Sequence, residues 1–346
     1  MFVWAFRCRL RGLTQRYGGT FLALLAFVNL VAGIALLTAY FFHIPPGPDF
    51  AALSTALPSP AADLRQSVAY EDGVLAPRAA ALVGDIYSAR ALLTELSSGR
   101  VLYRKAPEER SAPASLTKMM TIILALEALP DLDEEILLPE AIFPPLHTAG
   151  ASMAGFQPGE RVPVRDLLYG AMLPSGAEAA VGLACAVSGS ESDFVQRMNE
   201  KAGELGMTET RFANCTGLNH PGQWSTARDM TVLLQYALQN EMFRELFTRP
   251  TYRTPSNEYH PSGISMVNTM FSQVRTARIE EVGYLLGGKT GYDGPVSGLC
   301  LASLAEVGGE EYILITLGAG HGETSPALHL LDAFTIYSRI PEMLSM

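Results

Sequence analysis

The longest apolar run of the chain covers residues 20–42, where TFLALLAFVNLVAGIALLTAYFF contains no charged side chain. A run of this length can cross a bilayer as a helix. Four arginines and no acidic residue precede it, between residues 7 and 16. The positive-inside rule then places residues 1–19 in the cytoplasm and the chain after residue 42 outside. A cleaved signal peptide has a shorter apolar core followed by a small-residue cleavage site, so the pattern favours an uncleaved, single-pass transmembrane helix.

Residues 43–83 contain six prolines in an alanine-rich stretch without a sustained period, which is typical of a linker. Polar and apolar positions then alternate in 88–96 and 100–104, which predicts two strands joined by a Ser-Ser-Gly turn. Strand character returns near the C-terminus, and the part between is helical. We therefore predict that 84–346 form one α+β domain whose sheet is built from both ends of the domain. Helices are expected at 164–173, 177–187, 191–205, 226–239 and 325–338, and the later strands at 297–307 and 311–319.

Composition limits the kind of partner that the chain binds. The 346 residues are 48% hydrophobic and 17% charged, so a large core is available. The formal net charge of −10 argues against a nucleic-acid partner. The four cysteines form no Cys-x-x-Cys pair and no metal-ligand spacing with the histidines. Cys185 and Cys300 lie in apolar runs and are expected to be buried free thiols.

The segment APASLTKMMTIILALEAL, residues 112–129, places a lysine on the apolar face of a predicted helix. Ser115 and Lys118 lie one turn apart on the face that Ile122 and Leu126 continue. In one interpretation Ser115 only begins the helix and Lys118 extends its ammonium to water. In the other, burial lowers the pKa of Lys118, and the neutral amine takes the proton of a nucleophilic Ser115.

A second lysine motif, GGKTGYDG at residues 287–294, also has two functional interpretations. Counted from Gly283, the sequence GYLLGGKT satisfies the P-loop pattern, but a P-loop requires a helix that opens at its Lys-Thr pair. Gly291, Gly294 and Pro295 prevent such a helix. In the alternative, Lys-Thr-Gly lies on a sheet edge, where a cation and a hydroxyl bind a substrate carboxylate. An ordinary solvated turn is the non-functional alternative.

Ser-x-x-Lys, a middle serine triplet and Lys-Thr-Gly together are the signature of serine β-lactamases and penicillin-binding proteins. In this chain PASLTKMMT is followed by SGAEAA, then FANCTGL and STARDM, and finally GGKTGY. These segments resemble those of the D-alanyl-D-alanine carboxypeptidases, the low-molecular-weight penicillin-binding proteins, over about residues 84–340. The resemblance implies an antiparallel sheet with helices on both faces, a helical lobe, and a site in the cleft between them.

The same resemblance implies a role for each matching residue. Ser115 Oγ attacks the carbonyl of the penultimate D-alanine of a peptidoglycan stem peptide, and Lys118 is the base. The backbone N–H groups of Ser115 and Tyr292 form the oxyanion hole. Ser175 relays a proton to the departing D-alanine.

The remaining motif residues are expected to bind substrate. Lys289 and Thr290, with Gly291 beside them, hold the terminal carboxylate. Water then hydrolyses the acyl-enzyme, so the reaction needs no metal or cofactor. The resemblance also makes β-lactam antibiotics covalent inhibitors, and the arginine pattern makes the membrane a partner through residues 20–42.

The middle motif departs from the family pattern at two positions. Ala177 stands where asparagine is usual, and Glu178 replaces aspartate. A methyl group can neither donate to a substrate carbonyl nor accept from the catalytic lysine. SGAEAA also fits a helix start in which Ser175 and Glu178 form a capping box. Two alternatives to a carboxypeptidase therefore stay open: a β-lactamase, and a catalytically weak sensor that binds peptidoglycan or β-lactams.

Overall fold

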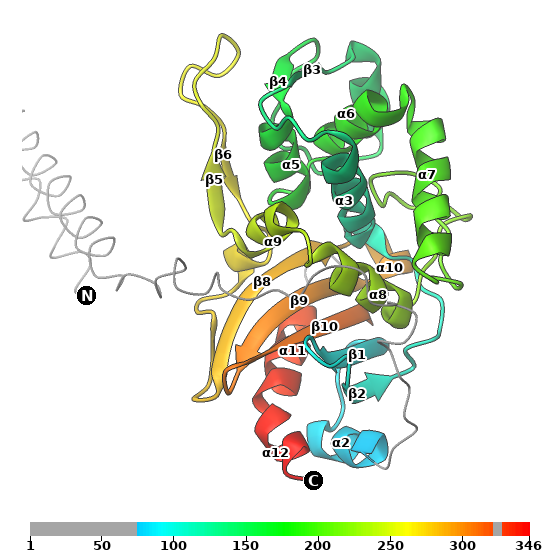
Figure 1. Cartoon of the computed structure of the whole chain (residues 1–346), viewed down its shortest axis with the longest axis vertical. Coiled ribbons are helices and arrows are strands. Elements are labelled where there is room, and N and C mark those ends of the chain that lie inside the picture. Colours follow the sequence, from blue (N-terminus) through cyan, green and yellow to red (C-terminus); the bar gives the residue numbers. More distant parts are fainter. Residues whose placement is uncertain (1–74, 321–326) are drawn as a thin grey trace, which may run out of the picture. The chain divides into compact units, whose positions relative to one another are not determined.

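A six-stranded antiparallel sheet is the centre of the computed structural model, which describes residues 75–320 and 327–346 (Figure 1). Its strand order is β2-β1-β10-β9-β8-β7. The first two strands in the chain thus pair beside the last, which confirms that the sheet is built from both ends of the domain. The strands are β1 (Arg90–Glu95), β2 (Val101–Lys105), β7 (Arg278–Ile279), β8 (Gly283–Gly291), β9 (Leu299–Val307) and β10 (Glu310–Ala319).

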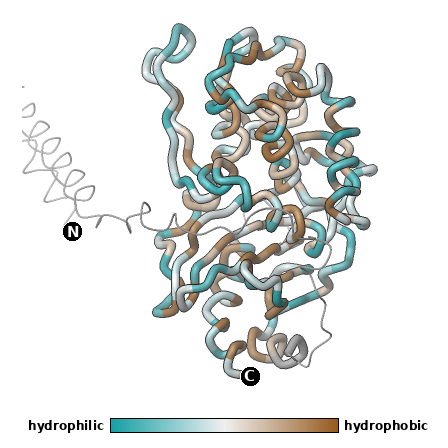
Figure 2. The backbone as a smooth tube through the Cα atoms, viewed as in Figure 1, coloured by the Kyte–Doolittle hydropathy of each residue, from teal (hydrophilic) through white to brown (hydrophobic). Residues whose placement is uncertain are grey.

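Both faces of this sheet are buried, because successive side chains of a strand point to opposite faces. Leu92 belongs to a core on one face and Leu93 to a separate core on the other. Ile313 and Leu314 are divided between the two cores in the same way. Figure 2 shows the result: hydrophobic positions gather along the central strands, whereas the tip of the β5–β6 hairpin is hydrophilic.

Helices cover the two faces. On one face α11 contacts β9 and β10, and on the other α8 contacts β10 and β1 while α9 contacts β8. The helix α3 packs against α8 and α9, which cover the second face of the sheet. It also packs against α5 and α6, which belong to a helical lobe (Figure 1). The bounds are α3 (Lys118–Ala128), α5 (Val164–Met172), α6 (Ala177–Ser188), α8 (Ala227–Ala237), α9 (Glu241–Thr248), α11 (Leu328–Ser338) and α12 (Ile340–Leu344).

Further elements complete the lobe and its connections. Two small antiparallel pairs are present, β3 with β4 and β5 with β6. The remaining elements are η2 (Ala114–Thr117), β3 (Glu135–Leu137), η3 (Glu140–Ile142), α4 (Phe143–Thr148), β4 (Arg161–Pro163), α7 (Glu191–Glu204), β5 (Thr251–Arg253), β6 (Ser265–Val267), η4 (Phe271–Gln273) and α10 (Gly294–Ser297).

The predicted linker ends too late. Its last nine residues form the helix α2 (Leu75–Val83), which contacts β2 and α12. Ala79 and Val83 are buried there, so the hydrophobic effect holds this helix on the domain. The predicted transmembrane helix over 20–42 lies outside the described residues. Within 75–320 and 327–346, no helix is long and apolar enough to span a membrane.

Candidate active site

Ser115 and Lys118 meet through the geometry of a 3-10 turn. Ser115 lies in η2 and Lys118 begins α3, and residues three apart in a 3-10 helix lie directly above one another. Lys118 Nζ is 3.1 Å from Ser115 Oγ and donates to the Thr216 carbonyl at 2.6 Å. Only 2% of Lys118 is exposed, so the expectation that its ammonium reaches water is wrong.

Burial lowers the pKa of Lys118 from 10.5 to about 8. The nearby Cys215 thiol and the Glu178 and Asp293 carboxyl groups act in the opposite direction and limit the shift. A lysine with this pKa is deprotonated in an appreciable fraction of molecules near neutral pH. The pair therefore has both the distance and the protonation equilibrium required of a nucleophile and its base.

The motif Lys-Thr-Gly forms the end of β8, beside this pair. A Cβ on Gly291 would lie 3.0 Å from Ser115 N, so glycine allows β8 to approach η2 closely. Lys289 is fully buried, and its Nζ donates to the Thr290 carbonyl at 2.9 Å. Burial and the neighbouring Lys118 hold the pKa of Lys289 well below its usual value. A bound carboxylate would favour the charged form of Lys289.

Ser175 occupies a left-handed backbone conformation, with φ 65°, two residues before the start of α6. Its Oγ is buried and has no hydrogen-bond partner among the described residues. The loop that carries it is fixed to β8 through Thr269, which sequence reasoning missed. Thr269 N donates to the Leu173 carbonyl at 3.0 Å, and the Thr269 and Thr290 hydroxyls are 2.6 Å apart. A single residue thus connects two of the predicted motifs.

The predicted capping box at the start of α6 is wrong. Gly176 is the N-cap and no side chain caps the helix. Glu178 Oε1 accepts from Ala154 N at 2.6 Å and from Gly155 N at 2.8 Å. Glu178 Oε1 accepts from these distant N–H groups and not from the N–H groups at the start of α6. Burial raises the pKa of the Glu178 carboxyl. Glu178 therefore fixes the loop around residue 154 to α6.

Ala177 contributes no polar atom to the site beyond its backbone. Its N–H donates to the Ser152 carbonyl at 2.8 Å, and its methyl group is almost fully buried. Glu178 Oε1 is occupied by hydrogen bonds from the loop around residue 154, and a carboxylate oxygen cannot donate as an asparagine amide does.

The segment FANCTGL supplies a main-chain acceptor to Lys118. Asn214 Oδ1 accepts from Thr216 N at 3.2 Å and from Gly217 N at 2.7 Å, which orients the Thr216 carbonyl toward Lys118. Gly217 has φ +87°, and a Cβ there would lie 2.0 Å from the Ala114 carbonyl oxygen. Any other residue at 217 would displace the turn that carries Ser115.

Asp293 is a further titratable group of the site that the motifs did not reveal. It follows Tyr292, and its N–H donates to Ser297 Oγ at 2.8 Å. Its Oδ2 is buried without a hydrogen-bond partner in the described part of the chain, and burial raises the pKa of this carboxyl. Asp293 thus adds negative charge to the surroundings of Lys118.

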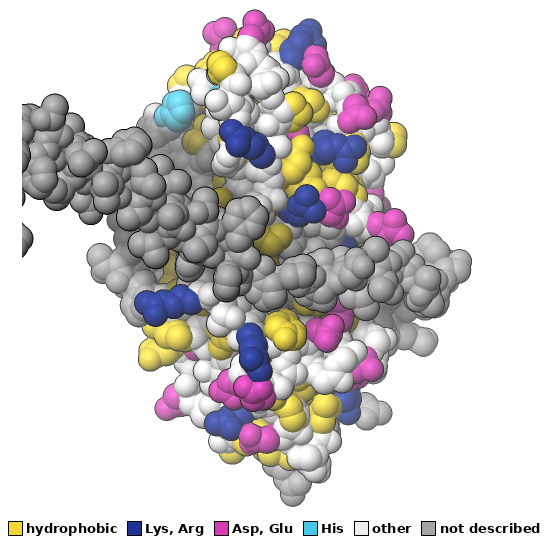
Figure 3. All heavy atoms as spheres, turned by 90° about the vertical axis from the view of Figure 1, so that its left-hand side faces the viewer, with side chains coloured by type: hydrophobic (Ala, Val, Ile, Leu, Met, Phe, Trp, Pro, Cys, Tyr) yellow, Lys and Arg dark blue, Asp and Glu magenta, His cyan; other side chains and the backbone are white. Residues whose placement is uncertain are grey.

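Other features of the described residues offer no comparable chemistry. Cys185, Cys215 and Cys300 are free thiols; Cys300 is buried as predicted, but Cys185 is only partly buried. Residues 75–320 and 327–346 contain no cluster of His, Cys, Asp or Glu that could bind a metal ion. On the face in Figure 3, acidic and basic side chains are interspersed, and no continuous basic field is visible.

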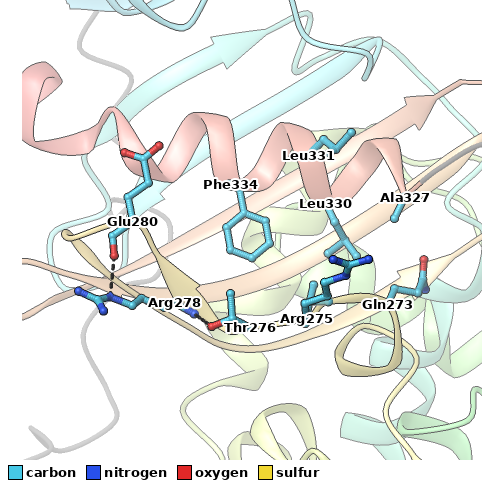
Figure 4. A pocket seen from close by; sticks show the side chains of 10 residues that line it. Gln273, Arg275, Thr276, Arg278, Glu280, Ala327, Leu330, Leu331 and Phe334 are labelled. Atoms are coloured by element: carbon cyan, nitrogen blue, oxygen red, sulfur yellow. Dashed lines mark hydrogen bonds between the residues drawn. The ribbon is translucent and has the colours of Figure 1, made fainter.

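A hollow of about 370 Å³ lies between α11 and the segment 273–280. Leu330 and Phe334 of α11 face this segment in Figure 4. None of the predicted catalytic or substrate-binding residues lines it. The predicted catalytic and substrate-binding residues lie instead on η2, α3, β8 and the loop before α6.

Comparisons with known proteins point to one family. A family model described as D-alanyl-D-alanine carboxypeptidase matches residues 76–321. The D-alanyl-D-alanine carboxypeptidase DacF of Bacillus subtilis is 37% identical over 256 residues, which cover 72% of this chain and 63% of DacF. The chain therefore spans less than two thirds of that relative. The D-alanyl-D-alanine carboxypeptidase of Streptomyces sp. strain K15 is 32% identical over 225 residues, or 62% of this chain and 75% of that protein.

Solved structures show the same similarity. The Streptomyces K15 DD-transpeptidase superposes with a TM-score of 0.65 and 28% identity, over 76% of this chain and 99% of its own. A D-alanyl-D-alanine carboxypeptidase from Mycobacterium tuberculosis gives 0.63 and 25%, over 76% of this chain and 93% of its own. The predicted antiparallel fold with its helical lobe is thus confirmed.

Proposed function

Because the chain belongs to the D-alanyl-D-alanine carboxypeptidase family, we propose that it is a serine-type carboxypeptidase that removes the terminal D-alanine from peptidoglycan stem peptides. The main support is one contact: the buried Lys118 Nζ lies 3.1 Å from Ser115 Oγ. A desolvated lysine costs stability, and a lysine whose pKa is lowered beside a serine hydroxyl is a candidate general base.

Acylation begins when neutral Lys118 accepts the proton of Ser115 Oγ. The oxygen attacks the carbonyl carbon of the penultimate D-alanine, and a tetrahedral intermediate forms. The N–H groups of Ser115 and Tyr292 donate to the oxyanion, where negative charge develops only after the attack. Collapse of the intermediate breaks the peptide C–N bond, and Ser175 passes a proton to the departing amine.

Substrate orientation depends on the end of β8. Lys289 and Thr290 receive the terminal carboxylate, which places a negative charge beside the buried Lys289. Water then adds to the ester carbonyl of the acyl-enzyme and gives up a proton. The bond between the acyl carbon and Ser115 Oγ breaks, Oγ regains a proton, and the shortened peptide leaves with a new terminal carboxylate.

The membrane attachment of this enzyme is part of the proposal. An uncleaved helix over residues 20–42 would hold the catalytic domain outside the cytoplasm, where stem peptides are found. Protease added to intact cells should remove the domain and leave a short N-terminal stub. Protection of the whole chain contradicts this topology, and release of a domain that begins just after residue 42 indicates a cleaved signal instead.

Benzylpenicillin provides the test of the nucleophile. Its β-lactam carbonyl should acylate Ser115, so the protein should gain the mass of the drug and the adduct should map to that residue. Ser115→Ala should gain none, and an adduct on that variant would show that the nucleophile is misassigned. Wild-type protein should also release D-alanine from a D-alanyl-D-alanine peptide.

One observation favours a second candidate function. The methyl group of Ala177 lies where a substrate-binding amide is usual, and such a site suits a binder with little turnover. The two functions differ in outcome, since a binder forms the penicillin adduct and releases no D-alanine.

A further inference from the structure

The hollow of about 370 Å³ between α11 and the segment 273–280, which we call the α11 hollow, has an apolar floor. Its volume is at the lower end of the range for small-molecule sites. Leu330 belongs to the core on this face of the sheet, and Val274 and Phe334 pack against that core. Leu331 continues the apolar surface outward and is 50% exposed. The hollow is therefore an opening in the covering of this core.

Hydrogen bonds hold the segment that faces α11. Gln273 lies in η4, and its Nε2 donates to the Thr269 carbonyl at 2.7 Å. Leu285 N donates to the Ala277 carbonyl at 2.7 Å, which fixes the next part of the segment to β8. The opposite wall is a regular helix. A ligand that enters a recess built in this way loses little free energy to ordering the protein.

One end of the hollow carries an uncompensated positive charge. Arg275 lines the hollow beside Leu330, and it forms no ion pair with any residue that the structure describes (Figure 4). At the opposite end, Arg278 donates to the Glu280 carbonyl at 2.8 Å and pairs with the Glu281 carboxylate. The Glu280 side chain also lies at that end (Figure 4). The Arg275 end is thus complementary to an anion.

We propose that the α11 hollow binds a small amphipathic carboxylate. The alkyl or aryl group of such a ligand packs on Leu330, Phe334 and Val274, where its apolar surface leaves water. The carboxylate accepts from the planar guanidinium of Arg275, which matches its geometry. This site is separate from the end of β8, and it does not depend on the proposed function.

Calorimetry with 4-phenylbutyrate and with the corresponding amide tests the charge. The two probes share the same apolar portion, and only the acid is negatively charged. We expect the whole protein to bind the acid about fivefold more tightly, the size of an ion pair at the rim of a pocket. Equal Kd values would overturn the proposal, and so would the failure of both probes to bind at millimolar concentration.

Two arginine variants locate the carboxylate. Arg275→Gln should bind the acid and the amide equally. The matched control Arg278→Gln should keep the fivefold preference, because the guanidinium that it removes is already engaged by the Glu280 carbonyl and Glu281. An equal loss of preference in both variants would indicate an effect of overall charge and contradict the assignment of Arg275.

A third variant tests the apolar floor. Leu331 is half exposed, so Leu331→Asp should leave the fold intact while it places a negative charge at the hollow. We expect it to weaken binding of the acid by more than it weakens binding of the amide, because the two carboxylates repel each other. An unchanged Kd for both probes would show that they bind elsewhere.

A carboxylate can also bind at the end of β8, where Lys289 and Thr290 are expected to hold that of the substrate. We therefore expect Thr290→Val to bind 4-phenylbutyrate with the Kd of the wild-type protein. Loss of binding in Thr290→Val, together with normal binding by Arg275→Gln, would place the probe in the active site and overturn the proposal. Release of D-alanine is not part of these measurements, so a failure of the carboxypeptidase function would leave them unaffected.

Discussion

The hydroxyl oxygens of Thr269 and Thr290 lie 2.6 Å apart, although the two residues are on different elements. Thr290 belongs to β8 and is expected to hold the substrate carboxylate, while Thr269 is tied to the Leu173 carbonyl. Thr269 therefore links the hydroxyl of Thr290 to the loop that carries Ser175. This contact gives Thr269 a positioning role.

The variant Thr269→Val keeps the volume of the side chain and removes the hydroxyl. We expect KM for a D-alanyl-D-alanine peptide to rise about three- to tenfold, the value of one hydrogen bond, with a smaller change in kcat. Steady-state kinetics measure this, with Thr251→Val, at an exposed position of β5, as the control. An unchanged KM would show that Thr290 needs no such support.

The pH dependence of acylation should report Lys118. Because this lysine must be neutral to act as the base, kcat/KM should increase as pH rises through about 8. The Asp293 carboxylate stabilises the ammonium, so Asp293→Asn should lower the pKa of Lys118 and move this limb of the profile to lower pH. Stopped-flow acylation by benzylpenicillin at several pH values measures the midpoint. A midpoint equal to that of the exposed-site control Asp133→Asn would contradict the coupling.

The buried lysine should also destabilise the fold. Its pKa falls from 10.5 to about 8, which corresponds to about 3 kcal/mol of lost stability below pH 8. Lys118→Met removes this cost but leaves the Thr216 carbonyl without a donor, at about 1 kcal/mol. We therefore expect the free energy of unfolding at pH 7 to rise by about 2 kcal/mol while acylation is lost.

The pH dependence of the free energy of unfolding tests whether the buried charge of Lys118 is the cause of this difference. Between pH 8 and 10.5 the unfolded chain binds the proton that the folded protein releases, so the stability of the wild type rises with pH. The advantage of Lys118→Met should therefore shrink as pH increases in urea unfolding experiments. An advantage that is constant with pH would show that packing, and not the buried charge, is responsible.

Local patterns predicted most of the fold and the proximity of Ser115 and Lys118. The alternation at 88–96 and 100–104 predicted the strands β1 and β2. The Ser-x-x-Lys spacing predicted that the side chains of Ser115 and Lys118 lie close together. These features depend on neighbours within a few positions of the chain, which a single sequence records directly.

Contacts between distant segments were not predictable in this way. The Thr216 carbonyl is a main-chain group, and any residue type supplies one. Thr269 acts on a residue 21 positions later, and Glu178 accepts from N–H groups 23 and 24 positions earlier. The capping box failed for that reason, because its residues were correct locally but Glu178 found partners in the loop around residue 154.

The alanine at position 177 gives the most direct test of how this site works. Ala177→Asn restores an amide that can donate to the substrate carbonyl in the transition state, and we expect acylation to become about tenfold faster. Since the Ala177 methyl is almost fully buried, the larger side chain should also lower Tm. Ala177→Leu has the branched shape of asparagine, a larger volume and no polar atoms, so it gives an upper limit for the effect of size without the amide. Slower acylation by both variants would show that the site has repacked around alanine. Faster acylation by the asparagine variant alone would show that the amide contributes a hydrogen bond that the natural chain lacks.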